Sequence, residues 1–173
     1  SNKSPLLQLI DNVSFFDEFS ESEKCELADK RAMVKKYDKK GSTIFSEGDK
    51  GNSVLVVLAG EVSIIKSSVP ATGEGRVSLR SPRDITLAKL GVGSVIGEVS
   101  LLSNKSRTTG VLTSASLVIV LEINKQNLES FNSSIQSKFH SQFISILIVF
   151  LSQRRVPRAL ENSSQLKSNT LNK

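Results

Sequence analysis

Glycine-containing turns divide the middle of the chain into short runs of valine, isoleucine and leucine, and this pattern restricts the possible folds most strongly. It extends from about Met33 to Ile123. Runs of this length suit strands better than helices, and glycine supplies the backbone conformations that tight turns need. The turn glycines are Gly41, Gly48, Gly51, Gly60, Gly73, Gly75, Gly91, Gly93 and Gly97. The segment therefore predicts a β-sandwich or a β-barrel.

Helical patterns precede this segment. Apolar residues recur at helix spacing in residues 5–10 and 21–33, and either Ser20 or Ser22 is a candidate N-cap for the second stretch. Within the strand-rich part, residues 66–84 contain prolines as well as glycines. That composition predicts a long hairpin tip.

The pattern becomes helical again after the strands. Asn124 is a candidate cap for a short helix, and a longer helix is expected over about 134–155, ended or kinked by Pro157. Its apolar stripe consists of Ile135, Phe139, Phe143, Ile146, Leu147, Phe150 and Leu151. We therefore predict one domain over residues 1–156 and a polar tail or linker over residues 157–173.

The residue types present argue against several classes of protein. One cysteine, Cys25, and one histidine, His140, cannot form an internal disulfide or a zinc site of the usual ligands, so no metal is expected. Cys25 itself fits a small, half-buried residue of a helix. We find no Ser-His-Asp set, no paired acids in a shared motif and no ATPase-type glycine loop, so the chain is not expected to be an enzyme.

The charge distribution and the hydropathy of the chain argue against specific binding of nucleic acid and against a membrane span. The net charge is +6, but the lysines and arginines are scattered from Lys3 to Lys173, which predicts a solvated basic surface and no specific binding of nucleic acid. The longest apolar run, residues 143–151, is too short to span a bilayer. No secretory signal is visible. These features predict a cytoplasmic domain without a membrane span.

Residues 97–109 bring together the groups that can recognise a sugar phosphate. Glu98 begins a short apolar turn, and Arg107 follows a small polar loop. A helix N-terminus offers free N–H groups to a phosphate, and an arginine beside it supplies a two-pronged donor. A carboxylate only accepts hydrogen bonds, which suits a sugar hydroxyl. The combination predicts a site for a small sugar phosphate.

This segment resembles the phosphate-binding cassette of cyclic nucleotide-binding domains. In that family the cassette reads roughly Phe-Gly-Glu-(aliphatic)-(Ala/Ser)-Leu-Leu, four residues, then Arg-(Thr/Ser/Ala)-Ala. Here it reads Gly97-Glu98-Val99-Ser100-Leu101-Leu102, four residues, then Arg107-Thr108-Thr109. The chain departs from the pattern at Thr109, where alanine is usual, at Ile96, where phenylalanine is usual, and at Gly110, where a small polar residue is common.

The similarity extends over about residues 12–155. Phe15-Phe16 and Phe19-Ser20 resemble the first helix of the family, residues 41–49 and 54–62 resemble its early strands, and residues 91–98 resemble the approach to the cassette. The resemblance implies an α+β fold, in which an antiparallel, jelly-roll-like β-roll (a double-stranded β-helix) carries N-terminal helices and a C-terminal lid helix. It also implies a regulatory module that binds a cyclic nucleotide monophosphate, cAMP first and cGMP as the alternative, with no other cofactor.

The resemblance implies seven ligand-binding residues: Gly97, Glu98, Val99, Ser100, Arg107, Thr108 and Thr109. Arg107 would grip the cyclic phosphate, and Glu98 would accept the ribose 2′-hydroxyl. Gly97 would let the backbone approach the ligand, and Val99 and Ser100 would offer backbone N–H groups.

Thr108 and Thr109 follow the arginine directly. In the family, a hydroxyl right after the arginine can reach the phosphate and, with a syn purine, the guanine amino group, so Thr108 is compatible with cGMP. Simpler roles stay open: Arg107 as a structural ion pair, Glu98 as a carboxylate at a helix dipole, and the two threonines as β-branched residues that begin a strand.

Other functions also stay open. A domain of the same fold that binds no nucleotide would need neither Glu98 nor Arg107, and both are present. A transcription regulator of the catabolite-activator type would need a helix-turn-helix, and the segment after Pro157 is short and polar. The helix over 134–155 would close over the purine or pair with its copy in a homodimer. The sequence does not identify an effector domain.

Overall fold

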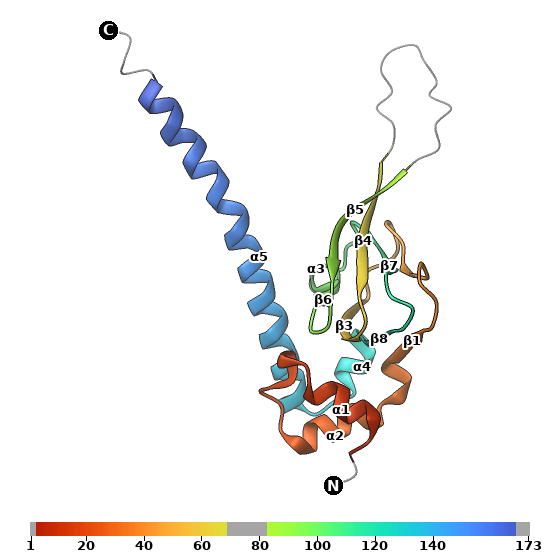
Figure 1. Ribbon diagram of the computed structural model, residues 1–173. Coiled ribbons are helices and arrows are strands. Elements are labelled where there is room, and N and C mark those ends of the chain that lie inside the picture. Colours follow the sequence, from red (N-terminus) through yellow and green to blue (C-terminus); the bar gives the residue numbers. More distant parts are fainter. Residues whose placement is uncertain (1–2, 69–82, 169–173) are drawn as a thin grey trace. The chain divides into compact units, whose positions relative to one another are not determined.

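The computed structural model describes residues 3–68 and 83–168, with side chains described as far as residue 153. Its strands form two four-stranded sheets, ordered β1-β8-β3-β6 and β2-β7-β4-β5 (Figure 1). They are β1 (Val34–Tyr37), β2 (Thr43–Phe45), β3 (Ser53–Ala59), β4 (Val62–Ser68), β5 (Arg83–Leu90), β6 (Val95–Ile96), β7 (Gly110–Thr113) and β8 (Val118–Asn124). All pairings are antiparallel. The predicted β-roll is confirmed, and the sheets do not close into a barrel.

Alternate residues of β3 and β8 fill the interior of the roll. The register pairs Val57 with Val120 and Leu55 with Glu122. Residues paired directly across antiparallel strands point to the same face of the sheet, and successive inward positions lie two residues apart. Val118 and Val120 are fully buried in this core. Glu122 is therefore the next inward residue of β8, at a position where the pattern would place another apolar side chain.

The N-terminal helices form where the apolar spacing predicts them. They are α1 (Pro5–Asp11), the 3-10 helix η1 (Ser14–Phe16), α2 (Glu21–Asp29) and the 3-10 helix η2 (Arg31–Met33). Ser20, not Ser22, caps α2: its hydroxyl accepts from the backbone N–H of Glu23, whose carboxylate accepts from the N–H of Ser20. Cys25 is exposed, because α2 turns its next residues, Leu27 and Ala28, toward the core. The expectation that Cys25 is half-buried was wrong.

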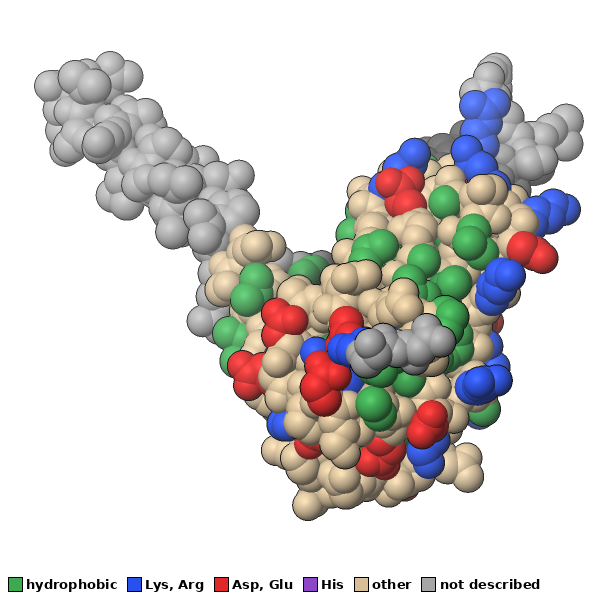
Figure 2. All heavy atoms as spheres, turned by 60° about the horizontal axis from the view of Figure 1, so that its bottom comes forward, with side chains coloured by type: hydrophobic (Ala, Val, Ile, Leu, Met, Phe, Trp, Pro, Cys, Tyr) green, Lys and Arg blue, Asp and Glu red, His purple; other side chains and the backbone are tan. Residues whose placement is uncertain are grey.

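Charged side chains on the N-terminal helices and on the residues just before them pair locally. Lys3 lies 2.7 Å from Asp11 and 3.1 Å from Glu21, and Lys24 lies 3.3 Å from Asp11. On the face shown in Figure 2, basic side chains are interspersed with acidic ones rather than gathered in a single patch. The charge on this face is therefore mixed, as the scattered lysines of the sequence predict.

The strands β4 and β5 pair from Val62 opposite Leu90 to Ser68 opposite Arg83. They form the stem of the hairpin that the sequence predicts over residues 66–84. The tip of this hairpin lies outside the described residues. The pairing places the stem at the edge of the sheet β2-β7-β4-β5.

The chain divides into two compact units, residues 1–136 and 137–173. After β8, Asn124 caps α4 (Lys125–Glu129) by accepting from the N–H of Asn127 at 2.7 Å. The last helix, α5 (Ser133–Ser168), crosses from the first unit into the second.

Helix α5 continues past Pro157, so of the two expected effects of this proline, an end or a kink, the helix end is excluded. A proline removes one backbone hydrogen bond and crowds the preceding turn, which a long helix can absorb as a local bend. The predicted tail over 157–173 begins inside this helix, and the division at residue 156 stays a prediction.

In the second unit, α5 carries apolar side chains on more than one side. The rings of Phe139 and Phe143 stack with centroids 5.9 Å apart. Several large apolar side chains of the same helix are exposed: Ile144, Ile148, Val149, Phe150 and Leu151. Among the described residues, no helix combines the length and the hydropathy that crossing a bilayer requires.

Candidate functional site

The predicted cassette begins where β6 gives way to a short helix. Gly97 follows β6 with a left-handed φ of 92° and is the N-cap of α3 (Glu98–Ser103). A Cβ at Gly97 would collide with Nη1 of Arg107 and would lie 3.0 Å from the carbonyl oxygen of Ser53. Both the backbone conformation and the space therefore require glycine here. Asn104, also left-handed, ends α3 and turns the chain toward Arg107.

Arg107 is the buried centre of the cassette, with 5% of its surface exposed. Its Nη2 donates to the carbonyl oxygen of Ser53 at 2.6 Å and to the Ser53 hydroxyl at 3.1 Å, and its Nη1 donates to the carbonyl oxygen of Gly97 at 3.4 Å. The guanidinium carbon lies 4.2 Å from the ring centroid of Phe45. All three acceptors are neutral oxygens, so they orient the guanidinium without neutralising its charge.

The Nε atom of this guanidinium takes no part in these hydrogen bonds. Within the described part of the chain, Nε of Arg107 is shielded from solvent and has no hydrogen-bond partner. Buried polar atoms are nearly always paired in proteins, and an exception calls for an explanation. A bound anion that accepts from this edge of the guanidinium would supply one.

Backbone hydrogen bonds fix the position of Arg107. Its N–H donates to the carbonyl oxygen of Asp49 at 2.8 Å, and its carbonyl oxygen accepts from the N–H of Gly48 at 2.9 Å. Lys50 and Ser106 form an isolated bridge beside them. The loop between β2 and β3 therefore fixes the main chain of Arg107, although the loop lies far from Arg107 in the sequence.

Burial affects both charged groups of the site, the carboxylate of Glu98 and the guanidinium of Arg107. Burial lowers the pKa of Arg107, while the carboxylates of Glu122, Asp49 and Glu98 act in the opposite direction. Burial also raises the pKa of Glu98, against backbone N–H groups of Glu98 and Gly97 and the charge of Arg107. A positive group with incomplete compensation at a buried position attracts an anion.

The remaining predicted residues divide into two groups. On α3, Ser100 is buried and Val99 is exposed. After the arginine, Thr108 is exposed and Thr109 is half-buried as the chain enters β7. The carbonyl oxygen of Thr108 accepts from Nζ of Lys66 at 3.1 Å, and the same amine forms an ion pair with Glu47. The structure thus gathers Gly97, Glu98 and Arg107 closely, and the threonines follow Arg107 where the chain enters β7.

Sequence reasoning missed three residues of this site. Ser53 and Phe45 contact the guanidinium directly. Gly51 lies against α3, since a Cβ there would overlap the Cβ of Ser100 and lie 2.6 Å from the carbonyl oxygen of Lys105. A signal for Ser53 exists in the sequence, because a serine opens an otherwise apolar run. The contact of Gly51 with the cassette is visible only in three dimensions.

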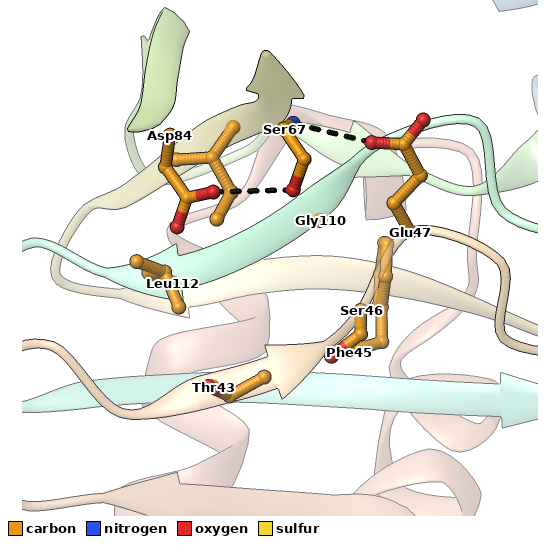
Figure 3. A pocket seen from close by; sticks show the side chains of 9 residues that line it. Thr43, Phe45, Ser46, Glu47, Ser67, Asp84, Gly110 and Leu112 are labelled. Carbon is orange, nitrogen blue, oxygen red and sulfur yellow. Dashed lines mark hydrogen bonds between the residues drawn. The ribbon is translucent and has the colours of Figure 1, made fainter. Parts of the chain in front are cut away.

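A separate hollow of about 210 Å³ lies on the sheet β2-β7-β4-β5. Figure 3 shows two carboxylates at it that both bond to Ser67: Glu47 accepts from the backbone N–H, and Asp84 accepts from the hydroxyl, each at 3.2 Å. It shares Phe45 with the surroundings of Arg107 but contains none of the seven predicted ligand-binding residues. Its acidic lining disfavours a phosphate.

Comparison with known proteins identifies the segment that carries this site. The model of the cyclic nucleotide-binding domain family matches residues 35–134. The cGMP-dependent protein kinase egl-4 of Caenorhabditis elegans is 28% identical over 134 residues, which are 78% of this chain and 16% of the kinase. The chain therefore spans less than a fifth of the length of this relative.

Solved structures share the fold. A cyclic nucleotide-binding domain from Methylobacillus flagellatus aligns with a TM-score of 0.63 at 22% identity, covering 88% of this chain and 82% of the other. The regulatory domain of Toxoplasma gondii PKA, solved with cAMP, aligns with a TM-score of 0.55 at 18% identity, covering 79% of this chain and 48% of the other. At these identities the likeness establishes the fold alone.

The contact between Gly51 and α3 generates a prediction. Gly51→Ala should lower the free energy of unfolding by about 1–3 kcal/mol, because the added methyl group overlaps Ser100 and the neighbouring backbone. Urea unfolding of the purified chain measures this. Gly91→Ala is the matched control, since a Cβ at Gly91 meets no atom within 4 Å. Equal stability of the two variants would contradict the packing described here.

Proposed function

Since this chain belongs to the cyclic nucleotide-binding domain family, we propose that it binds a cyclic nucleotide monophosphate, cAMP first and cGMP as the alternative. A domain of this family is a regulatory module and usually not a catalyst. The observation that carries the proposal is the buried guanidinium of Arg107, whose hydrogen-bond acceptors are neutral and whose Nε has no partner among the described residues. A cyclic phosphate is an anion that this donor edge fits.

The other proposed contacts follow from the positions of the cassette residues. Glu98 stands half-buried near Arg107 and would accept the ribose 2′-hydroxyl. The backbone N–H groups of Val99 and Ser100, at the start of α3, would complete the phosphate contacts, while Gly97 leaves room for the guanidinium of Arg107. In this arrangement the arginine neutralises the phosphate while the carboxylate selects the sugar.

The choice of purine depends on the residues after the arginine. Thr108 is exposed and Thr109 half-buried, so a hydroxyl is available beside the proposed phosphate site. The similarity to a cGMP-dependent kinase supports keeping cGMP as the alternative ligand. The output that the domain controls, and a cytoplasmic location, stay predictions, because the chain covers only a small part of that relative.

Removing the arginine tests the proposal. Wild-type protein should give a binding isotherm with cAMP in titration calorimetry, and Arg107→Ala should weaken the affinity by about tenfold to more than a hundredfold, as expected for hydrogen bonds to a charged group. Arg83→Ala, which removes an exposed arginine of β5, should bind as wild type does. The absence of heat and of a melting shift with both cAMP and cGMP at millimolar concentration would refute the proposed function.

The role of Glu98 is tested through the ribose. Wild-type protein should bind cAMP more tightly than its 2′-deoxy analogue, by about tenfold or more for a hydrogen bond to a carboxylate. Glu98→Ala should bind the two nucleotides equally, whereas Glu129→Ala, on α4, should keep the preference. If wild-type protein does not distinguish them, Glu98 is only a carboxylate at the start of α3.

We also propose that α5 responds to the ligand. The helix exposes a group of large apolar side chains that includes Ile144 and Ile148, and such groups are usually covered in the working state of a protein. A ligand can move such a helix only if it binds the protein with different affinity when the helix is in one position and when it is in the other.

Hydrogen exchange over residues 134–155 measures this response. Nucleotide should slow exchange there as well as in the cassette. High protection without ligand, together with a dimer in sedimentation, would assign the helix to a homodimer instead. Fast exchange that ignores the ligand, in a monomer, would contradict both roles.

A further inference from the structure

Two polar side chains interrupt the apolar interior of the roll at the end nearest Arg107. Glu122 follows Val118 and Val120 on the inward face of β8. Ser53 begins β3 and is 4% exposed. Glu122 is half-buried at this position, and a hydrogen-bond partner stabilises a carboxylate that has given up part of its contact with water. The structure supplies that partner.

The two side chains form a chain of hydrogen bonds that ends on the arginine. The Ser53 hydroxyl donates to Oε1 of Glu122 at 3.0 Å and accepts from Nη2 of Arg107 at 3.1 Å. A serine hydroxyl has one proton and two lone pairs, and an ionised carboxylate only accepts. Glu122 therefore accepts the hydrogen bond from the Ser53 hydroxyl, and this orientation leaves a lone pair of the serine oxygen to accept from the guanidinium.

We propose that Glu122, acting through the Ser53 hydroxyl, is a positioning residue for Arg107 and thereby sets the affinity of the site for a phosphate. The linkage fixes the plane of the guanidinium before any ligand arrives, so less order has to be created on binding. The effect on affinity rests on the proposed function. The ordering of Arg107 does not, because the hydrogen bonds form without ligand.

The same pair of groups occurs elsewhere in the chain without the arginine. The Ser114 hydroxyl donates to Oε1 of Glu61 at 2.9 Å, beside the turn between β3 and β4. Glu61 lies 3.9 Å from the amine of Lys89 rather than beside a cassette residue. This pair is a matched control, since it has the same chemistry at a distance from the proposed site.

A double-mutant cycle tests the linkage through the affinity for cAMP. Ser53→Ala and Glu122→Gln should each weaken binding about three- to tenfold, the range of one intramolecular hydrogen bond, and the double variant should bind no more weakly than the weaker single variant. Ser114→Ala and Glu61→Gln should bind as wild type does. Melting temperatures of all variants show whether the fold is intact.

Two results of this cycle would overturn the proposal. Tighter binding by Glu122→Gln would show that the carboxylate acts by repelling the phosphate. Fully additive losses would show that Ser53 and Glu122 act separately.

A second measurement needs no ligand. Nitrogen-15 spectra of the arginine side chains, with Arg107→Lys used for assignment, report how fast the guanidinium rotates. Rotation should be slow in wild-type protein and in Ser114→Ala, and faster in Ser53→Ala and Glu122→Gln. Equal rotation in all four would refute the positioning role, even if cAMP binds. Slow wild-type rotation that both variants lose would support it even if no cyclic nucleotide binds and the proposed function fails.

Discussion

The burial of one positive charge organises this domain. A guanidinium removed from water is tolerated only when oxygens surround it in good geometry. Arg107 finds them on β3 and at Gly97, with the ring of Phe45 against it. Its main chain is bonded to the loop between β2 and β3. Segments that are distant in sequence must therefore meet around one side chain, and the roll is the framework that brings them there.

The roll itself was predictable, because its signals are local. Glycines between short β-branched runs indicate turns and strands over a few residues, and Ser20 and Asn124 cap helices that begin directly after them. The seven residues of the cassette are also consecutive enough for a sequence pattern to identify. Their roles toward a ligand stay predictions, although the structure gathers the glycine, the acid and the arginine.

The features that could not be predicted depend on which distant strands pair, or on tertiary packing that overrides a local preference. Ser53 and Glu122 are 69 residues apart and meet only because β3 pairs with β8. Local spacing could not place Cys25 on the outer side of α2, because it does not tell which side of a short helix the core covers. Pro157 lacks the backbone N–H that continues a helix and therefore favours a helix end, but α5 is helical on both sides of it.

Gly51 and Gly97 are among the glycines that leave no room for a Cβ, and this has a consequence for how such chains diverge. Their restrictions come from neighbouring atoms of the protein, so they act whether or not a ligand is present. A descendant that lost Glu98 would still be under selection to keep both glycines, since its fold would still need them. Glycines of this kind therefore indicate shared ancestry and fold, whereas the charged residues Glu98 and Arg107 indicate the ability to bind a ligand. A survey of relatives that treated these glycines as ligand-binding residues would therefore count domains that bind no nucleotide among those that do.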